Sequence, residues 1–544
     1  MFSISDVGNS SGDVVGTSPL LKSTTDESPP KWTPPRGFLL IEIAIFANVF
    51  LAGFDGTITA STYAVIGSEF NAANTISWLT TSYLITSTAF QPLYGRFSDI
   101  LGRRACFFTA TWTFLIGCLG CGLAPDVVTL NLMRALTGLG GGGLMTMATI
   151  INSDMIPFKE RGMYQACQNV LFGFGAICGA SLGGLIADTI GWRWCFLCQV
   201  PVSIFAFAVG YFAIKNQETS VVETDADDGE QGPKVAKSLW IQIDLSGAVL
   251  LVLGLSAQSA ALSMGGNNYP WADIRVIVSF VVSVVLLALF VVVELRTRAN
   301  PVLPMFMLKG QLAISNLVTN LFVGMAAYAF LFMIPLFFQV VLGDTASQAG
   351  LRLVVPSLAT PIGGIIAGYT MSHWGRLSEM VKIGSFFMIL GNGLVASLKF
   401  EDASWKYIVY LFPANLGQGI AYPSILFTFL AAFDHTEQAV STSIVYLVRS
   451  LGTVWGVAFS SAIVQNVLTT RLPLVLDGIP DMDRFIDEIR HSVSVLKKLP
   501  PEIEGLAREV YFEALKYAFL ASAGFALIAL ISGFFARGRR LDRD

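Results

Sequence analysis

Four ionisable residues stand inside long apolar stretches of this chain, where a charge is costly. Asp55 and Glu42 lie in the first such stretch, Arg134 in the fourth and Arg449 near the end of the chain. A charged side chain inside a membrane segment usually faces a cavity or an oppositely charged partner. A desolvated carboxyl group also holds its proton more tightly, so that it can exchange protons near neutral pH. The carboxyl groups therefore predict proton exchange that can drive the movement of a solute, although Glu42, nearer the cytoplasmic end, equally suits a position at the membrane interface. Arg449 needs a partner or an anionic group of the substrate.

Other polar side chains stand at similar depth and could line a passage for that solute. Amide and hydroxyl groups at such positions either contact a substrate or only hydrogen-bond a neighbouring helix. Both interpretations stay open for these residues. The candidates for lining a cavity are Gln165, Asn169, Gln199, Asn320, Tyr328 and Gln339.

The elements that must position these residues are the apolar stretches themselves. About 20 apolar residues cross the hydrocarbon core of a bilayer as a helix. Only 13% of the 544 residues are charged, which is about half the share in soluble globular proteins. The sequence therefore predicts an all-α polytopic membrane protein. Its fourteen predicted transmembrane helices lie near 38–58, 75–95, 106–124, 127–150, 163–187, 193–214, 240–262, 273–294, 312–341, 350–371, 381–398, 405–430, 441–463 and 514–536.

The basic residues predict how these helices are oriented. Lys and Arg accumulate in short loops on the cytoplasmic side of a membrane. Most of them fall on the side of the two termini when the N-terminus is placed in the cytosol. The basic residues of 464–513 are an exception, but long loops cross the membrane largely regardless of charge. We therefore expect both termini in the cytosol and the long loop on the luminal or external side.

The predicted helices divide the chain into regions. Residues 1–37 are rich in Ser, Thr, Gly, Asp and Pro, a composition that predicts a disordered cytoplasmic tail. The other predicted regions are an N-terminal six-helix bundle at 38–214, a cytoplasmic loop at 215–239, two extra helices with a linker at 240–311, a C-terminal six-helix bundle at 312–536 that includes the long loop 464–513, and a cytoplasmic tail at 537–544.

The two halves of the chain share a pattern of small and basic residues. Two glycines and an arginine of 95–103 recur in 368–376, and the glycine pair of 175–179 recurs in 452–456. Transporters are often built from such repeats, with the substrate site between them near the bilayer midplane. The predicted architecture is therefore two six-helix bundles plus two extra central helices.

The loop Gly95–Arg104, between the second and third predicted helices, resembles the signature loop of the major facilitator superfamily. The matching residues are Gly95, Asp99, Gly102, Arg103 and Arg104. The resemblance implies a major facilitator fold, with this loop on the cytoplasmic face in a gating function. In that function, Asp99 pairs with Arg103 or with a helix end and so holds one conformation.

Further motifs resemble the fourteen-helix drug:proton antiporter branch of this superfamily. The run Asp55–Ile58 is similar to a first-helix motif of that branch, and the segment around Arg134 resembles a helix associated with proton coupling. The fifth predicted helix resembles the antiporter motif, although Ala180 stands where that motif has proline. The small residues of this helix-packing motif are Gly175, Gly179, Gly183 and Gly184.

A more specific resemblance is to the fungal vacuolar basic amino acid transporters. Gly191–Pro201 has Gln-Val-Pro where drug pumps commonly have Asn-Leu-Pro, and Ile334–Val340 is also similar to this group. The resemblance implies a proton antiporter of the vacuolar membrane that moves basic amino acids from cytosol to lumen. The carboxylates of Asp55 and Glu42 suit a cationic substrate. One alternative is a plasma-membrane efflux pump for drugs or secondary metabolites, and another is a membrane receptor that transports nothing.

Other functional classes find no support in the sequence. It has no Gly-x4-Gly-Lys-Ser/Thr nucleotide loop, no Ser/His/Asp set and no metal-binding spacing of His and Cys. We therefore predict a transporter rather than an enzyme, with no cofactor or metal and with a proton gradient as its energy source. The expected partners are a small cationic substrate and membrane lipid, without nucleic acid, and the expected form is a monomer.

Overall fold

The computed structural model describes most of the chain between its two ends. The described residues are 33–35, 37–70, 78–214, 244–265, 269–297, 301–344, 346–400, 402–434, 437–476 and 500–536. The chain forms two units, Met1–Pro35 and Arg36–Asp544, and every helix described below belongs to the second unit. Four predicted segments lie outside the described residues, either wholly or in large part: they are 1–37, 215–239, 537–544 and the middle of the loop 464–513.

The first half of the chain forms helices at the six predicted positions. They are α1 (Phe38–Glu69), α2 (Trp78–Leu101), α3 (Arg103–Leu123), α4 (Val127–Met155), α5 (Phe158–Thr189), α6 (Arg193–Leu197) and α7 (Gln199–Ala213). The sixth predicted helix is therefore divided at Cys198, shortly before Pro201. Proline fits the first turn of a helix because no intrahelical partner is needed for its missing N–H, so the break lies where a new helix can begin.

The two extra helices follow as α9 (Leu245–Met264) and α10 (Ile274–Arg296). They pack against each other, and α9 also packs against α2. Most of α10 is exposed, including Ile277, Val281 and Val285. In water such a continuous apolar surface would be costly, so this face of α10 suits contact with lipid.

The second half of the chain forms the remaining predicted helices. They are η1 (Met305–Leu308), α11 (Gln311–Val340), α12 (Ala346–Ser357), α13 (Ala359–Trp374), α14 (Leu377–Ala396), α15 (Lys406–Val409), α16 (Phe412–Leu430), α17 (Gln438–Val475) and α20 (Pro501–Phe535). The tenth predicted helix is divided into α12 and α13 at Leu358, and Pro356 and Pro361 flank this break. Pro356 lies inside the last turn of α12 and removes a backbone hydrogen bond there, whereas Pro361 lies in the first turn of α13, where proline is tolerated.

Within the described residues, eleven helical segments are long and apolar enough to cross a membrane. The remaining three predicted positions, 75–95, 127–150 and 405–430, hold α2, α4 and α16. These three helices are less apolar, since they carry many glycine and hydroxyl side chains that are buried inside the protein and need not match lipid. The structure is thus an all-α polytopic membrane protein, and the fourteen predicted positions are all helical.

Helices extend into both ends of the segment 464–513, which was predicted as a loop. Helix α17 continues to Val475, and α20 begins at Pro501. Leu468 and Leu472 of α17 are fully buried in one apolar cluster with Ala507 of α20. Apolar side chains four positions apart share one helix face, so the two helices extend as a packed pair into the segment predicted as a loop.

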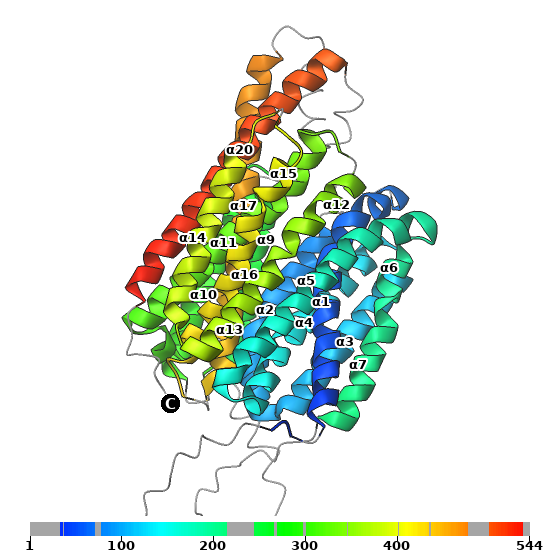
Figure 1. Ribbon diagram of the computed structural model, residues 1–544. Helices are drawn as coiled ribbons and strands as arrows, with labels where there is room; N and C mark the ends of the chain where they lie inside the picture. Colours follow the sequence, from blue (N-terminus) through cyan, green and yellow to red (C-terminus); the bar gives the residue numbers. More distant parts are fainter. Residues whose placement is uncertain are drawn as a thin grey trace, which may run out of the picture. The chain divides into compact units, whose positions relative to one another are not determined.

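The two halves of the chain lie side by side (Figure 1), with α5 packed against α13 and α2 against α17. The backbones of α5 and α13 come close at Gly162 and Gly368, where an added Cβ atom would crowd the opposite helix. On the other side, a Cβ atom on Gly95 would overlap Ser443 of α17. Small residues thus allow helices of the two bundles to touch backbone to backbone.

Candidate functional site

A fully buried ion pair lies in the N-terminal bundle and joins α1 to α4. Nη1 of Arg134 is 2.8 Å from both carboxylate oxygens of Asp55, and neither side chain is exposed. Gln199 of α7 donates a further hydrogen bond of 3.2 Å to Asp55. Gln199 is the first residue of α7, and Pro201 favours the start of a helix at this point. The start of α7 therefore brings the amide of Gln199 to the carboxylate of Asp55.

The guanidinium of Arg134 has neighbours on several sides. Its Nε donates to the carbonyl oxygen of Leu79 over 3.3 Å, and the group lies 4.6 Å from the ring centre of Tyr83 and 5.6 Å from that of Phe196. Among the described residues, its Nη2 has no hydrogen-bond partner. The group is held by one carboxylate and by aromatic faces, which attract cations through their π electrons.

Helix α1 is packed closely on α5 around this pair. A Cβ atom on Gly175 or Gly179 would overlap the backbone of α1, and one on Gly53 would overlap the backbone of α5. Gly183 is buried, and its carbonyl oxygen accepts a hydrogen bond from the thiol of Cys195. A Cβ atom on Gly184 would meet open space. Three glycines therefore set the distance between the two helices, and Gly184 does not.

The signature loop connects three helix ends, and we call the end of the bundle next to Gly95–Arg104 the loop face. Nη1 of Arg103 is 2.6 Å from Asp99, and Nε is 2.7 Å from Asp154 at the end of α4. Gly102 has a φ of +90°, a backbone conformation that favours glycine. Arg103, the predicted partner of Asp99, thus forms an ion pair with it. Asp154 was not predicted from the sequence, although an acid at a helix end that returns to a basic loop is a signal for such a partner.

The guanidinium of Arg104 lies outside this network. It stands 5.0 Å from the ring centre of Tyr211 and 5.5 Å from that of Phe108. The residue therefore packs on aromatic rings of α3 and α7 rather than on an acid of the loop.

The two bundles are hydrogen-bonded to each other in the half of the molecule nearer the loop face. Arg161 of α5 donates to Gln438 of α17 over 2.6 Å. Deeper in the interface, the hydroxyl groups of Thr149 and Tyr446 are 2.8 Å apart. Ser450 donates to Gln91 over 2.7 Å. These bonds hold the loop face closed between the bundles.

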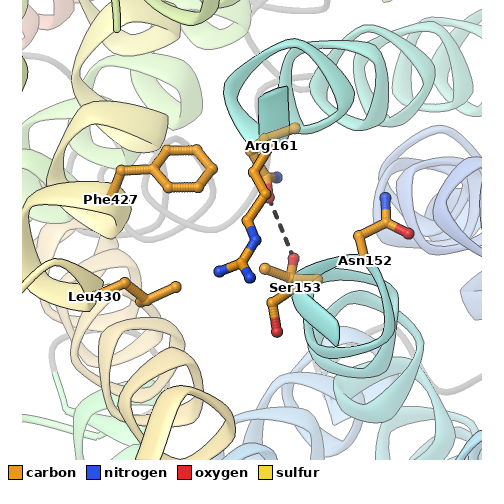
Figure 2. A pocket seen from close by; sticks show the side chains of 7 residues that line it. Asn152, Ser153, Arg161, Phe427 and Leu430 are labelled. Carbon is orange, nitrogen blue, oxygen red and sulfur yellow. Dashed lines mark hydrogen bonds between the residues drawn. The ribbon is translucent and has the colours of Figure 1, made fainter. Parts of the chain in front are cut away.

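A small cavity lies just inside this closed face (Figure 2). Its lining residues are Thr149, Asn152, Ser153, Arg161, Gln165, Phe427 and Leu430. In Figure 2 the guanidinium of Arg161 points between Ser153 and the apolar side chains of α16. The cavity is polar on the side of the N-terminal bundle and apolar on the side of α16.

Glu42 of α1 is close to this region and is only 3% exposed. The carboxyl group of Glu42 faces the side-chain amide of Asn152 on α4, and both residues are buried. Glu42 precedes Asp55 by thirteen residues on one helix, which places it about 20 Å nearer the loop face. The two predicted acids therefore occupy different depths in α1.

The other predicted cavity-lining residues are distributed over the interior. Gln165 accepts a hydrogen bond of 3.4 Å from Thr149 in the small cavity. Asn169 faces Gly364 of α13 across the bundle interface. Asn320 is fully buried and donates to the carbonyl oxygen of Val445 over 2.6 Å, which ties α11 to α17.

Tyr328 and Gln339 are both half-buried on α11. Tyr328 lies in the middle of this helix, and Gln339 lies at its far end from the loop face. The structure therefore places Tyr328 at the depth of the buried charges and Gln339 near the opposite surface.

Arg449 of α17 is half-buried and has a different environment from Arg134. Nη2 of Arg449 donates to the carbonyl oxygen of Tyr422 over 3.0 Å. The guanidinium lies 4.2 Å from the ring centre of Tyr422 and 5.2 Å from that of Tyr446. No acid in the described part of the chain forms an ion pair with it.

An exposed ion pair ties α1 to α6 at the face opposite the signature loop. Arg193 and the indole N–H of Trp192 each donate to Glu69 over 2.6 Å. The hydrogen bond from Arg193 is the main cause that holds the pKa of Glu69 below its ordinary value. The residues described at this face and elsewhere contain no cluster of three His, Cys, Asp or Glu side chains that could hold a metal ion.

Comparison with known proteins places this arrangement in a family. Residues 45–457 match the model of the Major Facilitator Superfamily. The chain is similar in fold to the crystal structure of the human organic anion transporter MFSD10, with a TM-score of 0.58 over 92% of this chain and 100% of that one, at 11% identity. At that identity the likeness concerns the fold alone.

Several curated relatives cover nearly the whole chain. Vacuolar basic amino acid transporter 2 of Saccharomyces cerevisiae is 44% identical over 460 residues, which are 84% of this chain and 96% of the relative. The vacuolar membrane amino acid uptake transporter fnx2 of Schizosaccharomyces pombe is 34% identical over 92% of this chain and 84% of its own. Multidrug resistance protein fnx1 of the same yeast is 35% identical over 92% and 90%. The predicted resemblance is thereby confirmed.

Proposed function

The chain belongs to the major facilitator superfamily, and we propose that it is a proton-coupled antiporter that moves basic amino acids from the cytosol into the vacuole. The names of two relatives, a vacuolar basic amino acid transporter and a vacuolar amino acid uptake transporter, support the substrate class and the membrane. The observation that carries the coupling is the buried pair of Asp55 and Arg134.

This pair can respond to a single proton. A proton on Asp55 removes the negative charge that balances Arg134, and a buried charge without its partner is strongly destabilising. The proton and Arg134 therefore compete for the same carboxylate. Because the two residues lie on different helices, α1 and α4, protonation favours a different arrangement of these helices. A transported cation that approaches Asp55 competes in the same way.

The contacts at the loop face supply the matching gate. The closed interface uses three polar contacts, Arg161 with Gln438, Thr149 with Tyr446, and Ser450 with Gln91. Single hydrogen bonds of this kind contribute only about 0.5–3 kcal/mol each, which is weak enough for them to be exchanged during a transport cycle. We propose that they break when the bundles rock, while the network of Arg103 with its two acids holds the helix ends together in the closed state.

Glu42 offers a second proton site on the same helix. Its carboxyl group is buried beside Asn152 of α4. Glu42 lies nearer the loop face than Asp55, so we propose that it receives protons on their way to the cytosol. All of these groups belong to one chain, so a monomer can complete the cycle, and no enzymatic step or cofactor is proposed.

The second candidate function is efflux of drugs or secondary metabolites across the plasma membrane. The name of the relative fnx1, a multidrug resistance protein, supports it. Its identity to this chain is 35%, against 44% for the basic amino acid transporter. The higher identity favours the vacuolar function.

Uptake of labelled lysine into vacuolar vesicles from a strain that lacks its own basic amino acid transporters tests the proposal. We expect the chain to support uptake in the presence of a proton gradient and a protonophore to abolish it. Asp55→Asn should reduce uptake to background. Asp126→Asn is the matched control, because Asp126 is an exposed helix cap and Asn caps helices equally well. Lysine uptake that persists after the gradient is collapsed would contradict the proposal, as would transport of drugs alone.

A further inference from the structure

Arg449 is a positively charged residue in the interior, and no acid among the described residues forms an ion pair with it. It lies on α17, half-buried, and its Nε is without a hydrogen-bond partner. Arg134, by contrast, is balanced by Asp55 at 2.8 Å. An uncompensated charge among membrane helices is costly and normally marks a functional contact. The two arginines therefore have different functions, and Arg449 is the one that is free to receive an anion.

The aromatic rings around Arg449 leave only part of its guanidinium available. Tyr422 and Tyr446 stand 4.2 Å and 5.2 Å from the group, at distances typical of a cation that lies against aromatic faces. The carbonyl oxygen of Tyr422 accepts one hydrogen bond from Nη2. The N–H of Nε remains without a partner. Because Nε is covered by neighbouring atoms, a ligand can reach this edge only when the helices rearrange, and it must then approach in the plane of the guanidinium.

Approach along an edge matches the geometry of a carboxylate. A guanidinium can donate two parallel N–H bonds to the two oxygens of a carboxylate, which a lysine ammonium cannot do. Amino acids carry such a carboxylate whatever their side chain. The edge of Arg449 thus fits the one anionic group that every amino acid substrate has.

The side chains between Arg449 and Asp55 also indicate how a bound amino acid would be oriented. Tyr446, whose ring lies against Arg449, has its hydroxyl group 2.8 Å from that of Thr149 on α4, the helix that carries Arg134. Tyr83 of α2 in turn lies 4.6 Å from the guanidinium of Arg134, which pairs with Asp55. The tyrosines thus connect the C-terminal bundle, which carries Arg449, with the N-terminal bundle, which carries the acid. A basic amino acid has an anionic group at one end and a cationic group at the other, in the same order as these two residues.

We propose that Arg449 binds the α-carboxylate of the transported amino acid, with the cationic side chain of the substrate directed past the tyrosines toward Asp55. This assignment rests on the proposed function and adds its selectivity: substrates need a free carboxylate as well as a cationic group. Amines without the carboxylate, such as 1,5-diaminopentane, are then poor substrates, and so is lysine methyl ester.

The test uses the purified full-length protein in proteoliposomes with an imposed proton gradient. Uptake of labelled lysine is measured against unlabelled lysine, lysine methyl ester and 1,5-diaminopentane as competitors. For the native protein we expect lysine to compete at least about tenfold better than either analogue, since a hydrogen bond to a charged group is worth that factor. Arg449→Gln should raise the KM for lysine at least about tenfold and bring the three competitors within about twofold of one another.

Two further variants separate binding from folding. Arg449→Lys keeps the charge but not the two parallel bonds, so it should recover only part of the discrimination. Arg471→Gln is the matched control, because Arg471 pairs with Glu513 at an exposed site, and it should behave as the native protein. Thermal stabilisation of each purified variant by lysine, and by its methyl ester, reports binding even where transport is lost.

Two results would overturn the assignment separately from the proposed function. Native protein that transports lysine but is inhibited equally by the methyl ester would refute it, as would undiminished discrimination in Arg449→Gln. Native protein that transports no basic amino acid at all would instead refute the proposed function, and the assignment would fall with it.

Discussion

Removal of one member of the buried ion pair should cost far more stability than removal of both. In Asp55→Asn the carboxylate that accepts hydrogen bonds from Arg134 and Gln199 becomes a neutral amide. The guanidinium of Arg134 is fully buried, so no water can replace the lost partner. Breaking a buried pair from one side costs about 3–5 kcal/mol. Arg134→Gln leaves the opposite charge unbalanced and should cost a similar amount.

The double variant, Asp55→Asn with Arg134→Gln, removes both charges together. Buried pairs replaced as a whole are often close to neutral in stability, so the double variant should recover at least about 2 kcal/mol relative to either single variant. Thermal unfolding of the purified proteins in one detergent, compared as a double-mutant cycle, gives this coupling energy. Proton-driven lysine uptake should be at background in all three variants, because the proton-binding carboxylate is absent or without its competitor.

The cycle can fail in two informative ways. Additive single effects would mean that Asp55 and Arg134 do not interact as the 2.8 Å contacts require. Normal proton-driven uptake in the double variant, at normal amounts of protein in the membrane, would separate the pair from transport and refute its proposed function. The exposed carboxylate of Asp126, changed to Asn, again provides the matched control for a lost acid.

Three further predictions concern other parts of the molecule. Gly175→Leu should sharply reduce the amount of folded protein, because its side chain would overlap the backbone of α1. Gly184→Leu should not, because its side chain would meet open space. Fluorescence size-exclusion profiles of the tagged proteins compare the two variants. Asp99→Ala should slow lysine exchange severalfold with little change in equilibrium binding, since it removes one acid of the network at the loop face, and an equal loss of binding would argue against a gate. Arg193 holds the pKa of Glu69 below its ordinary value, so this pair stabilises the fold above about pH 4.5, and the stabilisation is lost as the pH falls further. Glu69→Gln should abolish this pH dependence of the unfolding temperature, an effect of at most about 1 kcal/mol for so exposed a pair. An unchanged pH profile in the variant would show that the pair contributes nothing.

Lipid explains why so much of the architecture could be predicted from sequence. Every backbone N–H and C=O group in the hydrocarbon core must be bonded within its own helix, so length and composition alone locate the membrane helices. All fourteen predicted positions are helical, including the less apolar α2, α4 and α16. The packed extensions of α17 and α20 were missed because they lie in a stretch with many charges, and only contact between the two helices buries their leucines.

The sequence also identified single residues by their chemistry, but not their partners. Asp55 and Arg134 were recognisable as isolated charges in apolar segments, and Arg449 as a cation without an acid on its own helix. That Arg134 neutralises Asp55 across 79 positions of the chain, while Arg449 remains unbalanced, was decided by tertiary structure alone. Which charges meet depends on which helix faces touch, and backbone contacts between distant glycines determine those faces. A charged residue in an apolar segment can be recognised from the local sequence, whereas the residue that neutralises it depends on how the helices pack.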